Sequence, residues 1–271
     1  MMRRGLWGLL ALTAVAGTYQ PLPPAVRQLP ESQLLLRPDP LRAATFLDRG
    51  IQLVHEGRLA LAVEQFRRAA ALDPANPNTS INIAYVLDKL GRYDEALAEL
   101  DRAEQLDPRN PTLFLNRGNT LLNCQRYEEA SEALQRAADL DPRNKLVYLN
   151  LATAHAKLQR WKDAAAAFAK AAELDPQNAA LWFNWAGALS SAGDTAGALQ
   201  KYEHAIELDP TNLGAYYNAA ALCEKLGDLD GAIRHIEAAR RAAPDNAQLQ
   251  EILVKLKEAK RRQRPTVQGP K

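Results

Sequence analysis

The chain has 271 residues, with 34 Lys and Arg against 32 Asp and Glu, and a formal net charge of +2. This near balance argues against a dedicated nucleic-acid-binding protein, which needs a strong basic excess. Residues 247–271 carry seven basic and two acidic side chains, which we interpret as the charged face of a terminal helix. Aromatic residues make up only 6% of the chain and alanine and leucine dominate, as is typical of an all-helical protein.

The first residues, MMRRGLWGLLALTAVAGTYQ, have the layout of a secretory signal peptide. Arg3 and Arg4 precede an apolar run, and Ala14 and Ala16 supply small residues at the spacing of a cleavage site. The run is shorter than the ~20 residues that span a bilayer, so residues 1–19 are predicted to be a signal peptide or a short membrane anchor. The protein is then exported to the bacterial periplasm or anchored facing it. If the run is instead an apolar tail, or reflects a misassigned start codon, the protein is cytoplasmic.

The sequence lacks the motifs of common catalytic and metal sites. Its four histidines form no pair at helical spacing, and Cys124 and Cys223 lie far apart in the chain. It contains no P-loop, no G-x-S-x-G and no G-x-G-x-x-G motif. We therefore expect no metal, no cofactor and no enzymatic activity.

An internal repeat organises most of the chain. Asp-Pro pairs recur every 34 residues, at 73–74, 107–108, 141–142, 175–176 and 209–210. This period divides the chain into six repeats, which are residues 43–76, 77–110, 111–144, 145–178, 179–212 and 213–246. Each repeat ends in Asn, a preferred helix N-cap, and position 15 is Gly in four repeats but Gln125 and Gln159 in the other two. Each repeat is therefore predicted to be a helix, a turn and a second helix.

Small and large residues alternate at fixed positions of the repeat. Position 8 is Gly or Ala, and positions 20 and 27 are always Ala. Position 24 is larger, as in Phe66 and Leu134. Small residues let antiparallel helices approach closely, and we expect the large residues to lie over small ones between adjacent repeats.

These residues resemble the tetratricopeptide repeat (TPR) family. Repeats 1 and 4 carry the family's residues at its offsets, namely Phe46, Gly50, Ala62, Phe66, Ala69 and Pro74, and Tyr148, Leu151, Ala152, Ala164, Phe168, Ala171 and Pro176. Arg117 departs from the pattern, because the family usually has leucine there. The resemblance covers residues 43–246 and implies an all-α fold, a right-handed superhelical α-solenoid of helix–turn–helix repeats.

The segments outside the repeats complete this interpretation. Residues 20–42 are predicted to be a proline-rich spacer with a short capping segment. Residues 247–264 contain an apolar stripe of Leu249, Ile252, Leu253 and Leu256 at helical spacing, which predicts a capping helix for the last repeat. Residues 265–271 are predicted to be a disordered tail.

The resemblance also implies that the first helix of each repeat lines a concave groove that binds peptides, with positions 2, 5, 6, 9, 12 and 13 of the repeat facing the groove. The candidate groove residues are the asparagines of position 6, the apolar residues of position 5 and the lysines of position 13. They are Asn82, Asn116, Asn150, Asn184 and Asn218; Leu115, Leu149, Phe183 and Tyr217; and Lys89, Lys157 and Lys225.

Two interpretations of the asparagine series stay open. A side-chain amide can pair with the N–H and C=O of a peptide, so a row of them resembles the asparagine ladder of some TPR proteins. Alternatively, each Asn bonds an adjacent helix or water. The lysines either attract acidic residues of a ligand or are solvated helix ends.

The sequence thus predicts a non-catalytic scaffold that binds a protein or an extended peptide segment, with no specific nucleic-acid partner. If the protein is exported, we expect it to support the assembly or stability of an envelope or membrane complex. Its N-terminal segment could then associate with the membrane. The alternative is a cytoplasmic TPR regulator or co-chaperone-like adaptor. The sequence gives no indication of the oligomeric state.

Overall fold

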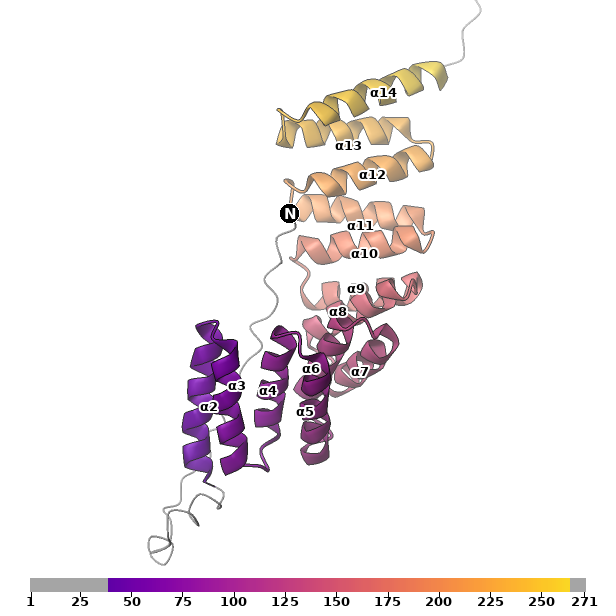
Figure 1. Ribbon diagram of the computed structural model, residues 1–271. Coiled ribbons are helices and arrows are strands. Elements are labelled where there is room, and N and C mark those ends of the chain that lie inside the picture. Colours follow the sequence, from indigo (N-terminus) through magenta and orange to yellow (C-terminus); the bar gives the residue numbers. More distant parts are fainter. Residues whose placement is uncertain (1–38, 264–271) are drawn as a thin grey trace, which may run out of the picture. The chain divides into compact units, whose positions relative to one another are not determined.

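The computed structural model describes residues 39–263, and its regular structure there is entirely helical (Figure 1). The first helices of the six repeats, and the final helix, are α2 (Pro40–His55), α4 (Pro77–Lys89), α6 (Pro111–Asn123), α8 (Lys145–Lys157), α10 (Ala179–Ser191), α12 (Leu213–Lys225) and α14 (Ala247–Gln263). The second helices are α3 (Leu59–Leu72), α5 (Tyr93–Leu106), α7 (Tyr127–Leu140), α9 (Trp161–Leu174), α11 (Thr195–Leu208) and α13 (Leu229–Ala242). The prediction of an all-α chain of helix–turn–helix repeats is confirmed.

The helices fall into two compact units, one ending at Asp141 and the other beginning at Pro142. We call their described parts the N-terminal half (39–141, α2–α7) and the C-terminal half (142–263, α8–α14). Within each half, the two helices of a repeat pack together, and each second helix packs on the first helix that follows it. None of the described helices is long and apolar enough to cross a bilayer. The predicted signal peptide, most of the spacer and the tail lie outside the described residues.

Asparagine caps begin the first helices, as the repeat ends predicted. The Asn110 side chain accepts hydrogen bonds from the backbone N–H groups of Thr112 and Leu113, at 3.0 and 3.4 Å. The same side-chain cap starts α4, α8, α10, α12 and α14. In repeat 1, Asp39 caps α2 by accepting from the N–H of Arg42, so α2 begins at Pro40, ahead of the predicted boundary at residue 43.

A left-handed residue ends each first helix. Position 15 has a positive φ in every repeat, from 58° at Gln159 to 90° at Gly193. Glycine adopts this conformation without strain, whereas Gln125 (φ 65°) and Gln159 place a side chain where L-residues are disfavoured. The prediction of a turn at this position is confirmed, including for the two glutamines.

The large residue of position 24 packs between repeats, as expected, and also within its own repeat. Tyr202 of repeat 5 lies in one cluster with Ala215 and Ala219 of the next repeat. A Cβ added to Gly50 would overlap the Phe66 ring, and one added to Gly118 would overlap the side chain of Leu134. In both cases the two residues belong to the first and second helices of one repeat. The physical reason is that the close antiparallel pair leaves no room there for a side chain on both helices. The alanines of positions 20 and 27 are fully buried in all six repeats.

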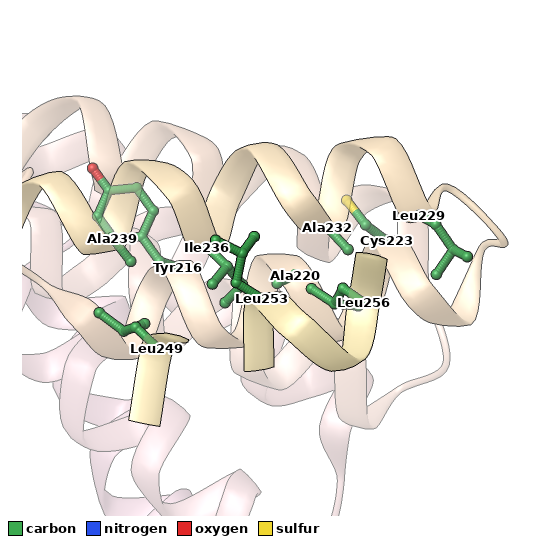
Figure 2. Packing of buried hydrophobic residues seen from close by; sticks show 10 residues of the cluster. All are labelled: Tyr216, Ala220, Cys223, Leu229, Ala232, Ile236, Ala239, Leu249, Leu253 and Leu256. Atoms are coloured by element: carbon green, nitrogen blue, oxygen red, sulfur yellow. The ribbon is translucent and has the colours of Figure 1, made fainter. Parts of the chain in front are cut away.

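Helix α14 covers the last repeat. Its residues Leu249, Leu253 and Leu256 are buried in one cluster with Ile236 and Ala239 of α13 (Figure 2). The apolar stripe predicted for residues 247–264 therefore lies against α13. Its fourth member, Ile252, is only partly buried at the edge of this cluster.

Candidate functional site

The candidate groove residues of the N-terminal half are largely inaccessible. Asn82 is 9% exposed, Asn116 is 6% exposed and Leu115 is 1% exposed. In this half, α4 and α6 pack directly against each other, in addition to their contacts with α5. The Asn123 amide reinforces this contact by donating to both carboxylate oxygens of Asp88, at 2.9 and 3.0 Å. Positions 5 and 6 of repeats 2 and 3 thus lie in the packing between helices rather than on an open surface.

The equivalent residues of the C-terminal half reach solvent. Asn184 is exposed near the middle of α10 and makes no hydrogen bond to the described residues. Asn150 and Leu149 of α8 are half-buried, as are Phe183 of α10 and Tyr217 of α12. The structure therefore places polar amides beside partly exposed apolar side chains on the first helices of this half, as a peptide groove requires.

The aromatic residues of this surface are held mainly by contacts within their own repeats. The Phe183 ring lies edge-to-face on Tyr202 of α11, with ring centroids 5.4 Å apart, and beside the backbone of Gly214 at the start of α12. The Tyr217 hydroxyl accepts a hydrogen bond from the Asn246 amide at 3.4 Å. These contacts fix the rings in place before any ligand binds.

Asn218 supports the alternative interpretation of the asparagine series at its own position. Its amide donates to the Tyr202 hydroxyl at 3.1 Å, which joins α12 to α11. Burial raises the pKa of Tyr202 above its ordinary value. At this repeat, the asparagine contributes to packing between repeats.

The lysines of position 13 are exposed at the C-terminal ends of their helices. Lys89 lies over Tyr85, with its Nζ 5.5 Å from the ring centroid. Lys157 and Lys225 make no ion pair and no hydrogen bond with the described residues. Positive charge at a helix C-terminus is favourable on its own account, so this placement fits a solvated helix end as well as a ligand contact.

Sequence analysis missed an aromatic cluster on α10 and α11. The Trp182 and Trp185 rings are 5.3 Å apart, the Lys201 ammonium lies 4.4 Å from the Trp185 centroid, and the His204 ring lies edge-on to Trp182 at 4.3 Å. Both tryptophans pack against buried alanines of α9. The available signal was the alanine run of residues 164–167 and 171–172, which requires large residues on the helix opposite.

Arg117, the departure from the family pattern, joins three helices of the N-terminal half. Its guanidinium lies 2.9 Å from the Asp101 carboxylate and 2.8 Å from the Glu104 carboxylate of α5. Arg136 of α7 reaches the other oxygen of Glu104 at 2.9 Å and stacks 4.0 Å over the Phe114 ring. An ion-pair network thus stands where the family has an apolar contact.

Two histidines have their pKa lowered by burial. Burial lowers the pKa of His155, whose Nδ1 is buried without a partner, and Asp163 opposes this effect. Burial also lowers the pKa of His235, although the Glu203 carboxylate lies 3.4 Å from its Nε2. Within residues 39–263, no group of three or more His, Cys, Asp or Glu side chains could hold a metal ion.

Two family models described as tetratricopeptide repeat match the chain, one over residues 53–116 and 189–256 and the other over residues 115–179. The most similar solved structures include YrrB, described as a TPR protein with an unusual peptide-binding site. It is 25% identical, with a TM-score of 0.62 over 70% of this chain and 98% of YrrB. No curated protein sequence gives a significant match.

Two further structures show the same fold. PilF of Pseudomonas aeruginosa is 22% identical, with a TM-score of 0.61 over 79% of this chain and 97% of its own. MamA of Desulfovibrio magneticus is 19% identical, with a TM-score of 0.58 over 63% of this chain and 97% of its own.

Proposed function

Because the chain belongs to the tetratricopeptide repeat family, we propose that it is a non-catalytic scaffold that binds a segment of a partner protein on its first helices. The observation that carries this proposal is the exposed Asn184 amide, which follows the half-buried Phe183 on α10, with the half-buried Tyr217 at the matching position of α12. An amide offers one acceptor and two donors, enough to pair with the backbone of an extended peptide. The fixed aromatic rings then supply apolar surface for its side chains.

The likeness to YrrB supports a peptide or protein as ligand, since YrrB is described as having a peptide-binding site. A role in assembling or stabilising an envelope or membrane complex rests on the export-like sequence of residues 1–19. We propose that the protein acts in the periplasm or is anchored facing it.

A photo-crosslinking experiment in the native cell tests the binding surface. A photoreactive phenylalanine analogue replaces Asn184 in one variant and Glu173, an exposed residue of α9, in the matched control. We expect discrete partner adducts from position 184 and none from position 173. Adducts that are absent at position 184, or equal at both positions, would contradict binding on the first helices.

The cellular location is tested separately by fractionation and by mass spectrometry of the mature N-terminus. Export predicts a periplasmic or membrane fraction, with cleavage after Ala16 or an uncleaved anchor. An intact N-terminus in the cytoplasmic fraction would favour the cytoplasmic regulator instead. That result would contradict export but would not affect the proposal about the binding surface.

A further inference from the structure

The two halves offer a ligand different surfaces at the same repeat positions. In the N-terminal half, Asn82 and Asn116 are less than a tenth exposed, and α4 packs directly on α6. In the C-terminal half, Asn184 is exposed and Phe183 and Tyr217 are half-buried. Only the second surface gives a ligand access to both amide and apolar groups, so the binding site is expected on α8, α10 and α12.

Small residues line the centre of this surface. Position 9 of α10 is Gly187, and a Cβ added there would meet only the Tyr202 hydroxyl, at an ordinary contact distance of 3.6 Å. Ser190, Ser191 and Ala221 occupy neighbouring groove positions on α10 and α12. The space over Gly187 therefore suits a bulky apolar side chain supplied by a ligand.

The charges of this half indicate where acidic groups of a bound segment would lie. Six of its nine lysines already have partners: Lys145, Lys170, Lys255, Lys257 and Lys260 pair with carboxylates, and Lys201 lies over the two tryptophans. Two of the three without partners, Lys157 and Lys225, stand at position 13 of α8 and α12. Glu224 is the one acidic residue at the groove positions of α8, α10 and α12. The two lysines therefore outnumber it, and the net charge at these positions is positive.

We propose that the C-terminal half alone binds the partner, and that the bound segment has an acidic character with a bulky apolar residue at its centre. The apolar residue lies over Gly187, and carboxylates of the segment face Lys157 and Lys225. This inference rests on the proposed function and specifies the ligand chemistry of that site.

The test uses the full chain and a displayed library of random peptides of about 12 residues. An extended peptide of that length rises ~3.3 Å per residue, so it reaches about 40 Å along the surface. We expect enrichment of peptides with Asp or Glu flanking a central Leu, Ile, Phe or Trp. Enrichment of basic peptides, or of peptides without a charge preference, would overturn the inference.

Charge reversal then tests the lysines with one enriched peptide, measured by fluorescence anisotropy. The double variant Lys157→Glu, Lys225→Glu should weaken binding roughly threefold to tenfold, because each exposed pair contributes little singly. The matched control is Lys162→Glu on α9, a third lysine without a partner that stands outside the groove positions. It should change the affinity less than about twofold. Equal affinities for both variants would overturn the charge assignment.

Filling the central space is an independent test. Gly187→Leu should abolish binding of the same peptide while circular dichroism stays unchanged, and Gly187→Ala should have a smaller effect. Unchanged binding by a folded Gly187→Leu protein would overturn the placement of the apolar residue. If the library yields no enriched peptide on the unmodified chain, the proposed function itself fails. If peptides bind but ignore every variant, only this inference fails.

Discussion

At the scale of single residues, the repeat pattern predicts which positions are small but not how small. Position 8 accepts Ala in repeats 2, 4, 5 and 6, whereas Gly50 and Gly118 face a Phe66 or Leu134 side chain that already fills the space. The sequence shows the glycines, but only the structure shows that the neighbour lies in the same repeat.

Gly118→Ala should therefore lower the free energy of unfolding by about 1–3 kcal/mol, because the added methyl group overpacks the contact with Leu134. The control is Gly187→Ala, whose Cβ makes only an ordinary contact with the Tyr202 hydroxyl and which should be neutral or stabilising by up to ~1 kcal/mol, since Ala favours a helix. Thermal unfolding of both variants measures the difference. A more stable Gly118→Ala protein would contradict the packing described here.

Gln125 is predicted to carry backbone strain that glycine would remove. Its φ of 65° is disfavoured for an L-residue, so Gln125→Gly should stabilise the protein by about 0.5–1 kcal/mol once the entropy of glycine is allowed for. The reverse change, Gly91→Gln at the same position of repeat 2 (φ 75°), should destabilise it. Unfolding midpoints in urea measure both, and a loss of stability in Gln125→Gly would refute the assignment.

The buried histidines predict a pH dependence of stability. Burial lowers the pKa of His155 and His235 in the folded state, below the unfolded value of about 6.5. The unfolded chain then binds more protons, so stability is complete above about pH 6.5 and falls as the pH drops through the folded pKa values. Thermal midpoints between about pH 7.5 and 5.5 should fall for the native chain and fall less for His155→Gln, His235→Gln. If the thermal midpoints of the native chain and the double variant fell equally with pH, the two histidines would not be the cause of the pH dependence.

At the scale of helices, the boundaries follow from short-range chemistry and were predictable. The Asn caps and the position 15 residues mark the start and end of first helices because their roles depend only on local backbone geometry. The direct packing of α4 on α6 was not predictable, because it depends on how successive repeats stack. For the same reason, Asn116 and Asn184 occupy the same position of the repeat pattern, but Asn116 is buried in the structure and Asn184 is exposed.

Helix α14 provides a test with adjacent residues. Leu253 is buried against α13, whereas Val254 is 46% exposed on the outer face. Leu253→Ala should destabilise the protein by about 2–4 kcal/mol through lost burial and the cavity left behind. Val254→Ala should change stability by less than ~0.5 kcal/mol. Equal effects in thermal unfolding would mean that α14 does not cap the last repeat through this face.

At the scale of the molecule, six repeats of one sequence pattern form two compact units that differ at their first helices. The pattern predicts the fold and the family, since both follow from residues repeated in register. It predicts the candidate site less well, because exposure at positions 5 and 6 depends on the helices that pack around them. We propose that the binding of a protein segment belongs to α8, α10 and α12 of the C-terminal half.

Isothermal titration calorimetry with one library-enriched peptide tests that claim most directly, using Asn184→Ala and its repeat equivalent Asn116→Ala in the full chain. Both alanine variants should stay folded, which circular dichroism checks. The account predicts that Asn184→Ala weakens binding about threefold to tenfold through lost hydrogen bonds, and that Asn116→Ala leaves the affinity unchanged. Binding that depends on Asn116 and not on Asn184 would contradict it.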